Sequence, residues 1–166
     1  YVDTKDEKLV EIRDNYNNRD VKIALKSSGD TISDFDMSAE TNLTFLKVTR
    51  KSGSSELWES NIMVSTNALK NASSKKIGSI ACLKMNETLF YEDLTSNEVF
   101  RYGSSKPVEI NGIKKFKILG VDQNDNLYLA SISGSTADGI FYGNPLQKSW
   151  TKISTMGTVN PNRLYV

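Results

Sequence analysis

The residues in this chain that are best suited to bind a ligand are aromatic side chains and polar residues beside predicted turns. Tyr and Trp offer rigid apolar area with a polar handle, and Asn or Arg can orient hydroxyl groups. That combination is typical of a site that stacks on the apolar face of a sugar. The same residue types also pack between sheets and form tight turns, so both interpretations stay open here. The predicted ligand-binding residues are Trp58, Asn126, Tyr128, Tyr142, Trp150 and Arg163.

Two groups of carboxylates raise the question of hydrolytic chemistry. Asp34 lies two residues before Asp36, and Glu92 precedes Asp93. A glycosidase places two carboxyl groups roughly 5 to 9 Å apart across a cleft, which proximity in sequence does not establish. The chain contains no histidine, which removes Ser-His and Cys-His pairs and the usual general base near neutral pH. We therefore expect no enzyme and no catalytic residues, and keep a glycosidase as a third hypothesis.

Metal and cofactor sites are not expected. One cysteine and no histidine cannot fill a tetrahedral zinc site. Asp122, Asp125 and Asn126 suggest a calcium-like cluster, but the EF-hand spacing and its distal Glu are missing. Neither glycine-rich phosphate-binding motif occurs. The single cysteine, Cys82, lies in an apolar run, where it is expected to act as a small buried hydrophobe.

The charge balance restricts the partners. There are 21 Lys and Arg against 20 Asp and Glu, a net charge of +1, which provides no basic stripe for a nucleic acid. No stretch of 18 apolar residues occurs, so we expect no membrane insertion. Three N-glycosylation sequons begin at Asn42, Asn71 and Asn86. They slightly favour a secreted or extracellular location over a cytoplasmic one, although a chain this rich in Asn, Ser and Thr would contain about three by chance.

The clearest pattern is an internal repeat. A polar turn followed by Leu and an aromatic begins the phrases NETLFY, NDNLYL and PNRLYV, and their leucines, Leu89, Leu127 and Leu164, are separated by 38 and 37 residues. A fixed period of this size is typical of repeat folds. We expect a single domain over residues 1–166, with repeat units at approximately 1–53, 54–86, 87–124 and 125–166.

Short alternating apolar runs separated by Gly, Asn, Asp and Ser predict strands in each unit. KFKILGV, NLYLAS, GIFYG and SWTKIS form a four-strand series, and IGSIACLKM, TLFYEDL, EVFRYG and KPVEI repeat it. We expect KFKILGV, IGSIACL and NLTFLKV to be the innermost strands, because they are the most apolar. The first 15 residues match the inner two strands, VKIALKSS matches the fourth, and TISDFDMSAE reads as an insertion in an outer loop.

These observations predict an all-β chain: a β-propeller of about four four-stranded antiparallel blades, or a fragment of a larger propeller. A small sheet cannot bury both its faces alone, whereas blades that stack around an axis bury both. A β-trefoil is the alternative, and it would show a longer, three-fold repeat. Both chain ends stop at the same phase of the repeat, which permits a four-bladed ring, a fragment, or two copies that complete one ring.

Residues 114–157 resemble a blade of the tachylectin-2 or tectonin family. Phe116, Ile118 and Leu119 match its first apolar element, and Asn126, Leu127 and Tyr128 match its turn and second strand. The remaining matches are Phe141, Tyr142, Pro145, Trp150, Ile153 and Gly157. The resemblance extends in part to 77–113, which lacks the Trp, and fades in the first 76 residues. It implies a propeller that binds carbohydrate without catalysis, at sites between neighbouring blades, as the fucose-binding propeller lectins also do.

The sequence therefore predicts a lectin-like, non-catalytic propeller whose partner is a glycan or glycoprotein. The alternative is a protein–protein interaction module that forms part of a larger propeller or assembly. In that case a second copy or a partner chain would complete the ring, because an open arc would expose an apolar blade face.

Overall fold

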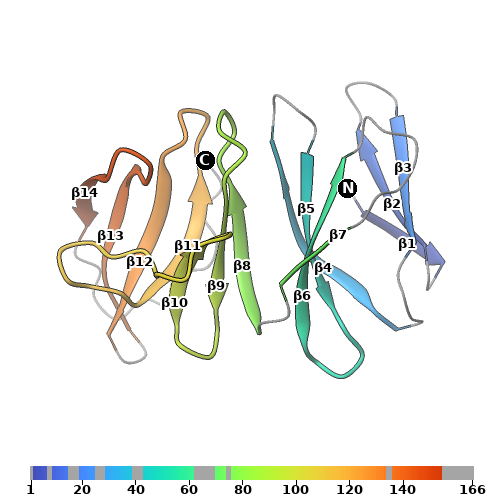
Figure 1. Cartoon of the computed structure of the whole chain (residues 1–166), viewed down its shortest axis with the longest axis horizontal. Helices are drawn as coiled ribbons and strands as arrows, with labels where there is room; N and C mark the ends of the chain where they lie inside the picture. The colour runs from blue at the N-terminus through green and yellow to red at the C-terminus, as the bar shows by residue number, and fades with distance from the viewer. Residues whose placement is uncertain are drawn as a thin grey trace.

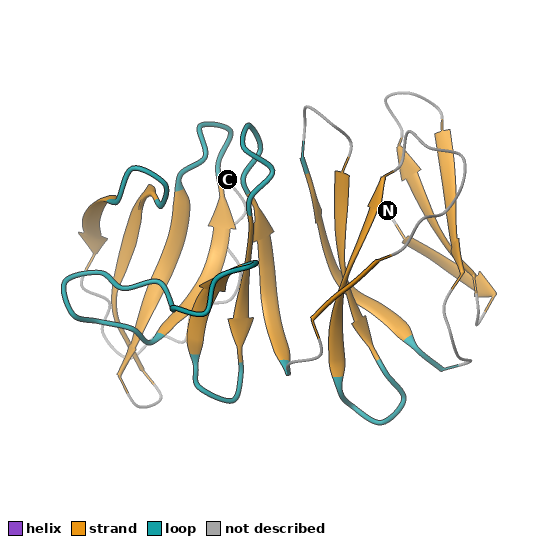
Figure 2. Cartoon of the chain, in the orientation of Figure 1, coloured by secondary structure: helices purple, strands orange, loops and turns teal. Residues whose placement is uncertain are grey.

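The computed structural model describes the backbone of residues 2–6, 9–14, 19–24, 29–38, 43–61, 70–73, 76–133 and 136–154. Side chains are described for residues 29–36, 38, 43–60, 76–132 and 139–153. Over these residues the secondary structure consists of β-strands and turns without a helix (Figure 2). The described residues accordingly provide no helix long and apolar enough to cross a membrane.

The strands form four antiparallel sheets (Figure 1). Sheet 1 contains β1 (Val2–Asp6), β2 (Leu9–Asp14) and β3 (Arg19–Ala24). Sheet 2 contains β4 (Thr31–Met37), β5 (Leu43–Thr49), β6 (Ser55–Asn61) and β7 (Lys70–Ser73). Sheet 3 contains β8 (Ile77–Cys82), β9 (Leu89–Asp93) and β10 (Glu98–Arg101). Sheet 4 contains β11 (Phe116–Val121), β12 (Leu127–Ser133), β13 (Thr136–Asn144) and β14 (Ser149–Ser154).

The sheets stand side by side as the blades of a propeller do. Within each sheet the strands follow one another in chain order. The first strands of sheets 2, 3 and 4 are in contact, β4 with β8 and β8 with β11, as expected for the inner strands of neighbouring blades. Sheets 1 and 4 lie at opposite ends of the row (Figure 1), so the described residues form an open arc of propeller blades. One sheet per repeat, rather than three-fold symmetry, rules out the β-trefoil.

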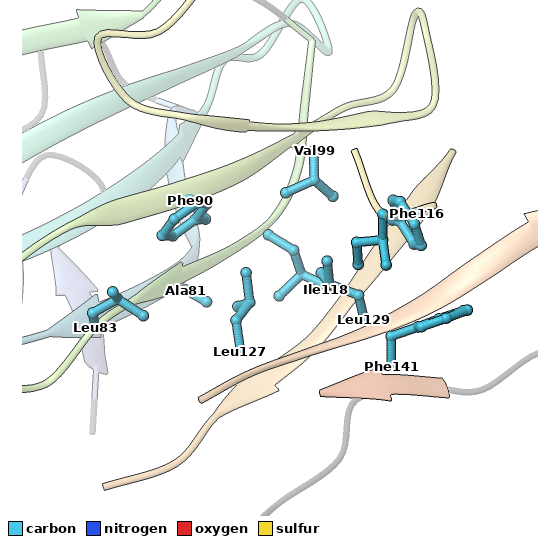
Figure 3. Close-up of a cluster of buried hydrophobic side chains, with 10 residues drawn as sticks. Ala81, Leu83, Phe90, Val99, Phe116, Ile118, Leu127, Leu129 and Phe141 are labelled. Carbon is cyan, nitrogen blue, oxygen red and sulfur yellow. The ribbon is translucent and has the colours of Figure 1, made fainter. Parts of the chain in front are cut away.

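Sheet 3 buries both of its faces against its neighbours, and alternation along its strands supplies the side chains. On β9, Leu89 and Tyr91 belong to the core between sheets 2 and 3, whereas Phe90 belongs to the core between sheets 3 and 4. Figure 3 shows the second core, in which side chains of sheet 3 meet those of sheet 4. Its members are Ala81, Leu83, Phe90, Val99, Ile110, Phe116, Ile118, Leu127, Leu129 and Phe141.

Two sequence predictions about sheet 2 are wrong. The segment TISDFDMSAE is not an outer-loop insertion, because its residues Thr31–Met37 form β4, the first strand of the sheet. NLTFLKV consequently forms β5, the second strand, rather than the innermost one. Two alternating aspartates make β4 look like a loop, but their carboxylates accept backbone hydrogen bonds from the neighbouring sheet. The inner-strand predictions for IGSIACL and KFKILGV are confirmed by β8 and β11.

Within the described residues, sheets 1 and 3 each contain three strands. The N-terminal segment forms β1 and β2, and VKIALKSS contributes most of β3, which pairs directly with β2. In sheet 3 the predicted fourth strand is reduced to an isolated bridge between Phe100 and Pro107. Proline lacks the N–H that a longer ladder would need. The hydrogen-bonded sheets also begin before the predicted repeat units. Sheets 3 and 4 begin one strand before residues 87 and 125, and sheet 2 begins two strands before residue 54.

Candidate functional site

Three of the predicted ligand-binding residues lie together on sheet 4. Tyr128 on β12 is directly opposite Tyr142 on β13. Their rings are stacked with centroids 5.6 Å apart and planes inclined by 19°. Leu127 and Leu129 point into the core against sheet 3, so by strand alternation Tyr128 points to the opposite face. We call that the outer face of sheet 4, and we call Asp122, Asn126, Tyr128 and Tyr142 the tyrosine platform.

The turn between β11 and β12 holds the polar part of the platform. One carboxylate oxygen of Asp122 accepts the backbone N–H groups of Asn124 and Asn126, each at 2.9 Å. The other accepts the Asn126 side-chain Nδ2 at 2.9 Å and the Tyr128 hydroxyl at 3.3 Å. Asp125 has φ 60°, a left-handed conformation that Asp tolerates in turns. This network fixes Asn126 beside the Tyr128 ring.

The same network sets the charges of the platform. Burial by itself would raise the pKa of Asp122, but the hydrogen bonds donated by Asn126, Asn124 and Tyr128 outweigh it and lower this pKa. Burial, together with the nearby charge of Asp122, raises the pKa of Tyr128. At neutral pH the platform therefore combines the ionised carboxylate of Asp122 with the neutral phenol of Tyr128. Its half-buried rings offer apolar area, and Asn126 offers an amide.

The two predicted tryptophans lie elsewhere. Trp150 on β14 is opposite Gly143 and packs, half-buried, against the core between sheets 3 and 4. It therefore lies on the other face of sheet 4 from the tyrosines. A Cβ on Gly143 would lie 1.8 Å from the Ser149 carbonyl oxygen, so glycine is required where β13 passes β14. The structure does not place Trp150 with the platform.

Trp58 on β6 is buried, with only 3% of its surface exposed. Its indole Nε1 donates to Glu56 at 3.0 Å, and the Arg50 guanidinium lies 5.3 Å from its ring centroid. Arg50 in turn donates to Glu56 at 2.6 Å and forms an ion pair with Asp30. These contacts occupy the indole, so we leave Trp58 out of the proposed site. The remaining predicted residue, residue 163, lies outside the described part of the chain.

The carboxylates considered for hydrolysis connect neighbouring sheets. On β4, Asp34 accepts the backbone N–H of Ile80 at 3.2 Å. Asp36 accepts the N–H of Cys82 at 2.8 Å and also pairs with Lys84. Because Ile80 and Cys82 belong to β8, these bonds join the inner strands of sheets 2 and 3.

Glu92, on the second strand of sheet 3, connects sheets 3 and 4 through similar hydrogen bonds. Its buried carboxylate accepts the N–H of Ser79 on β8 at 2.9 Å and that of Ile118 on β11. Burial raises the pKa of Glu92, against the opposing effects of these two hydrogen bonds and of Lys117 and Lys47. The geometry assigns this carboxylate the role of a hydrogen-bond acceptor between strands.

Sequence reasoning missed a third connection of this kind. Asp125, which is 1% exposed, accepts the backbone N–H of Met85 at 2.9 Å and the side-chain amide of Asn86. It thereby ties the β11–β12 turn to the β8–β9 turn. No sequence signal distinguishes this buried aspartate from the exposed residues of the same polar turn, because all of them are Asn, Asp or Gln.

Metal binding and thiol chemistry have no evident site among the described side chains. Within that part of the chain, no group of Cys, Asp and Glu is arranged to hold a metal ion. Cys82 is fully buried, as predicted. Burial, reinforced by the charge of Asp36, raises its pKa to about 12, so the thiol stays protonated.

Comparison with known proteins finds similarity in structure but not in sequence. No protein-family model matches the chain, and no curated protein sequence does. Among solved structures, a chain in the crystal structure of the mitotic checkpoint complex is similar, with a TM-score of 0.43 and 11% sequence identity. The match covers 92% of this chain and 59% of that chain. The present chain therefore spans less than two thirds of the length of that protein.

Proposed function

We propose that this chain is a non-catalytic binding module that holds a carbohydrate on the tyrosine platform of sheet 4. The observation that carries the proposal is the convergence of Asn126, Tyr128 and Tyr142, which come from a turn and two strands. Stacked, half-buried rings provide area for the apolar face of a pyranose, and amide, phenol and carboxylate groups beside them suit its hydroxyls. The resemblance of residues 114–157 to a tectonin blade supports the same ligand class.

The first experiment is a glycan array, followed by titration calorimetry with N-acetylglucosamine, fucose and any sugar that the array selects. Tyr142→Ala removes one ring of the platform without removing the Asp122 network. We expect it to weaken binding roughly 10-fold or more, from lost contact area and ring stacking. Tyr142→Phe keeps the ring and should bind within a few-fold of the native chain.

Tyr102→Ala is the matched control. Tyr102 follows β10 on sheet 3, and its side chain is 41% exposed, so its loss should leave sugar affinity unchanged. A native chain that binds no sugar on the array or in solution would exclude the proposal. Equal weakening by the substitutions at 142 and 102 would place any sugar site elsewhere.

A second candidate function, protein–protein interaction, is favoured by the position of the platform in the repeat. Phe90 and Tyr128 are equivalent, because each follows the leucine that marks its repeat. Phe90 is covered by sheet 4. The outer face of sheet 4 carries the buried Leu119 and Ala130, with Tyr128 and Ile140 packed beside them. A face of this kind can receive a further sheet, from a second copy or from a partner chain.

Solution mass distinguishes this second candidate. If the outer face of sheet 4 receives a second copy, light scattering should give a mass above that of the 18.5 kDa chain, and Ile140→Asp, on the same face, should return it to the monomer. Burying a carboxylate without a partner opposes association. A monomer across the micromolar range would exclude self-association through this face.

A further inference from the structure

The tyrosine platform carries a negative charge that has no balancing cation among the described side chains. Asp122 receives its four hydrogen bonds from two backbone N–H groups, one amide and one phenol, none of which is a cation. Hydrogen bonds of this kind favour the ionised carboxylate. An uncompensated charge at a binding surface discriminates strongly among ligands, because like-charge contacts are unfavourable.

Two lysines of sheet 4 have described interactions, and neither interaction is with Asp122, although Lys117 lies opposite Ala130 on the outer face. Lys152 lies over the ring of Phe141, at 5.7 Å from its centroid, and Phe141 points into the core against sheet 3. Lys117 acts on Glu92, which bridges sheets 3 and 4. Neither contact brings a positive charge to Asp122.

We infer that the platform selects neutral sugars and rejects acidic ones, with Asp122 as the residue that determines this specificity. The inference rests on the proposed function. The Asp122 carboxylate is 3.3 Å from the Tyr128 hydroxyl, so a pyranose stacked on the tyrosine rings would lie beside it. A carboxylate on that pyranose, about 6 Å from Asp122, would weaken binding about 3-fold in a water-like dielectric and about 100-fold at an effective dielectric constant near 20.

The test uses ligand pairs that differ only at C6, which carries a neutral hydroxymethyl group in one member and a carboxylate in the other. Methyl glycosides of glucose, galactose and N-acetylglucosamine are titrated into the native chain, and each hexoside that binds is compared with the uronic acid of the same ring. The native chain should prefer the neutral member by at least 3-fold. Asp122→Asn keeps one oxygen for the two backbone N–H groups and removes the charge, so it should bring the ratio to within 2-fold.

Two further measurements keep the result independent of any effect of the substitution on folding. Raising the ionic strength from about 0.01 to about 1 M shortens the Debye length from about 30 to about 3 Å, so the preference of the native chain should shrink. Glu109→Gln removes an equal charge from a side chain that is 53% exposed and lies outside the platform, and it should leave the ratio unchanged.

The outcomes separate the inference from the function on which it rests. Equal affinity of the native chain for a hexoside and its uronic acid would overturn the selectivity and leave sugar binding intact. So would a preference that persists both in Asp122→Asn and at high salt. A chain that binds no neutral glycoside would overturn the proposed function and the selectivity together.

Discussion

Replacing Glu92 with Gln tests whether the buried carboxylate between sheets 3 and 4 stabilises the fold. Glu92 is 5% exposed. One of its oxygens accepts the N–H of Ser79, and the other accepts that of Ile118. Glutamine has the same shape but only one oxygen, so its amide NH₂ would face one of these two N–H donors. The substitution removes one hydrogen bond and leaves a buried donor unsatisfied.

The magnitude follows from two opposing effects. A buried polar group left without its partner costs about 1–3 kcal/mol. Against this, the substitution also removes the cost of burying a charge, which is the effect that raises the pKa of Glu92. We expect the loss of the hydrogen bond to dominate. The free energy of unfolding at neutral pH should fall by about 1–3 kcal/mol, measured by urea denaturation with an unchanged m value.

The pH dependence of this loss has a definite sign. Because the pKa of Glu92 is raised above its ordinary value of 4.5, the folded chain binds more protons than the unfolded chain between those two pKa values. The contribution of Glu92 to stability is then fully present below pH 4.5 and declines as the pH rises through the raised pKa. The stability difference between the native chain and Glu92→Gln should therefore be largest in acid and smaller at neutral pH.

A matched control and a refuting result complete the experiment. Glu109→Gln changes an exposed carboxylate and should alter stability by less than about 0.5 kcal/mol. If Glu92→Gln proves as stable as this control, the bridge between β8 and β11 does not stabilise the fold. A difference that grows as the pH rises would refute the reasoning about its protonation. Loss of a hydrolytic activity with stability unchanged would instead support the glycosidase hypothesis.

The other predictions concern the same junctions between sheets. In Gly78→Ala the added Cβ would lie 2.2 Å from a carboxylate oxygen of Glu92 and 2.8 Å from Leu94 Cδ2, so the midpoint of thermal unfolding should fall further than in Gly112→Ala. A Cβ on Gly112 would meet no other atom, and Gly112 has φ 82°, so its substitution should cost only about 1 kcal/mol of backbone strain. Equal falls in the unfolding midpoint of the two variants would contradict the crowding at Gly78. Cys82, buried and with its pKa raised to about 12, should react with Ellman's reagent only as the chain unfolds in urea, and rapid labelling of the folded chain would show that it is accessible.

The repeat, and the strands within it, could be predicted from the spacing and alternation of apolar residues in the sequence. The spacing of Leu89 and Leu127 marks equivalent second strands, and both residues are fully buried or nearly so. The apolar segments around Ile77 and Phe116 form inner strands as predicted. These features depend on the alternation of side chains within one sheet, which a contiguous segment encodes.

Contacts between sheets were harder to predict. The two aspartates of β4 made the inner strand of sheet 2 resemble a loop. In sequence, a carboxylate that accepts backbone N–H groups of another sheet looks the same as a solvated carboxylate. Trp58 was likewise hard to interpret from sequence. It was predicted to bind a ligand, but its indole contacts Arg50 and Glu56. At the platform, sequence identified Asn126, Tyr128 and Tyr142 but not the role of Asp122 as their common partner.

The amino-acid sequence alone determined that this is an all-β repeat chain, because side-chain alternation and turn residues act over a few neighbouring positions. Only the tertiary structure decided which aromatic residues share a face and which carboxylates serve as connections between sheets. Those outcomes depend on strand pairing and sheet stacking, which bring together residues such as Asp34 and Ile80 that lie 46 positions apart in the chain.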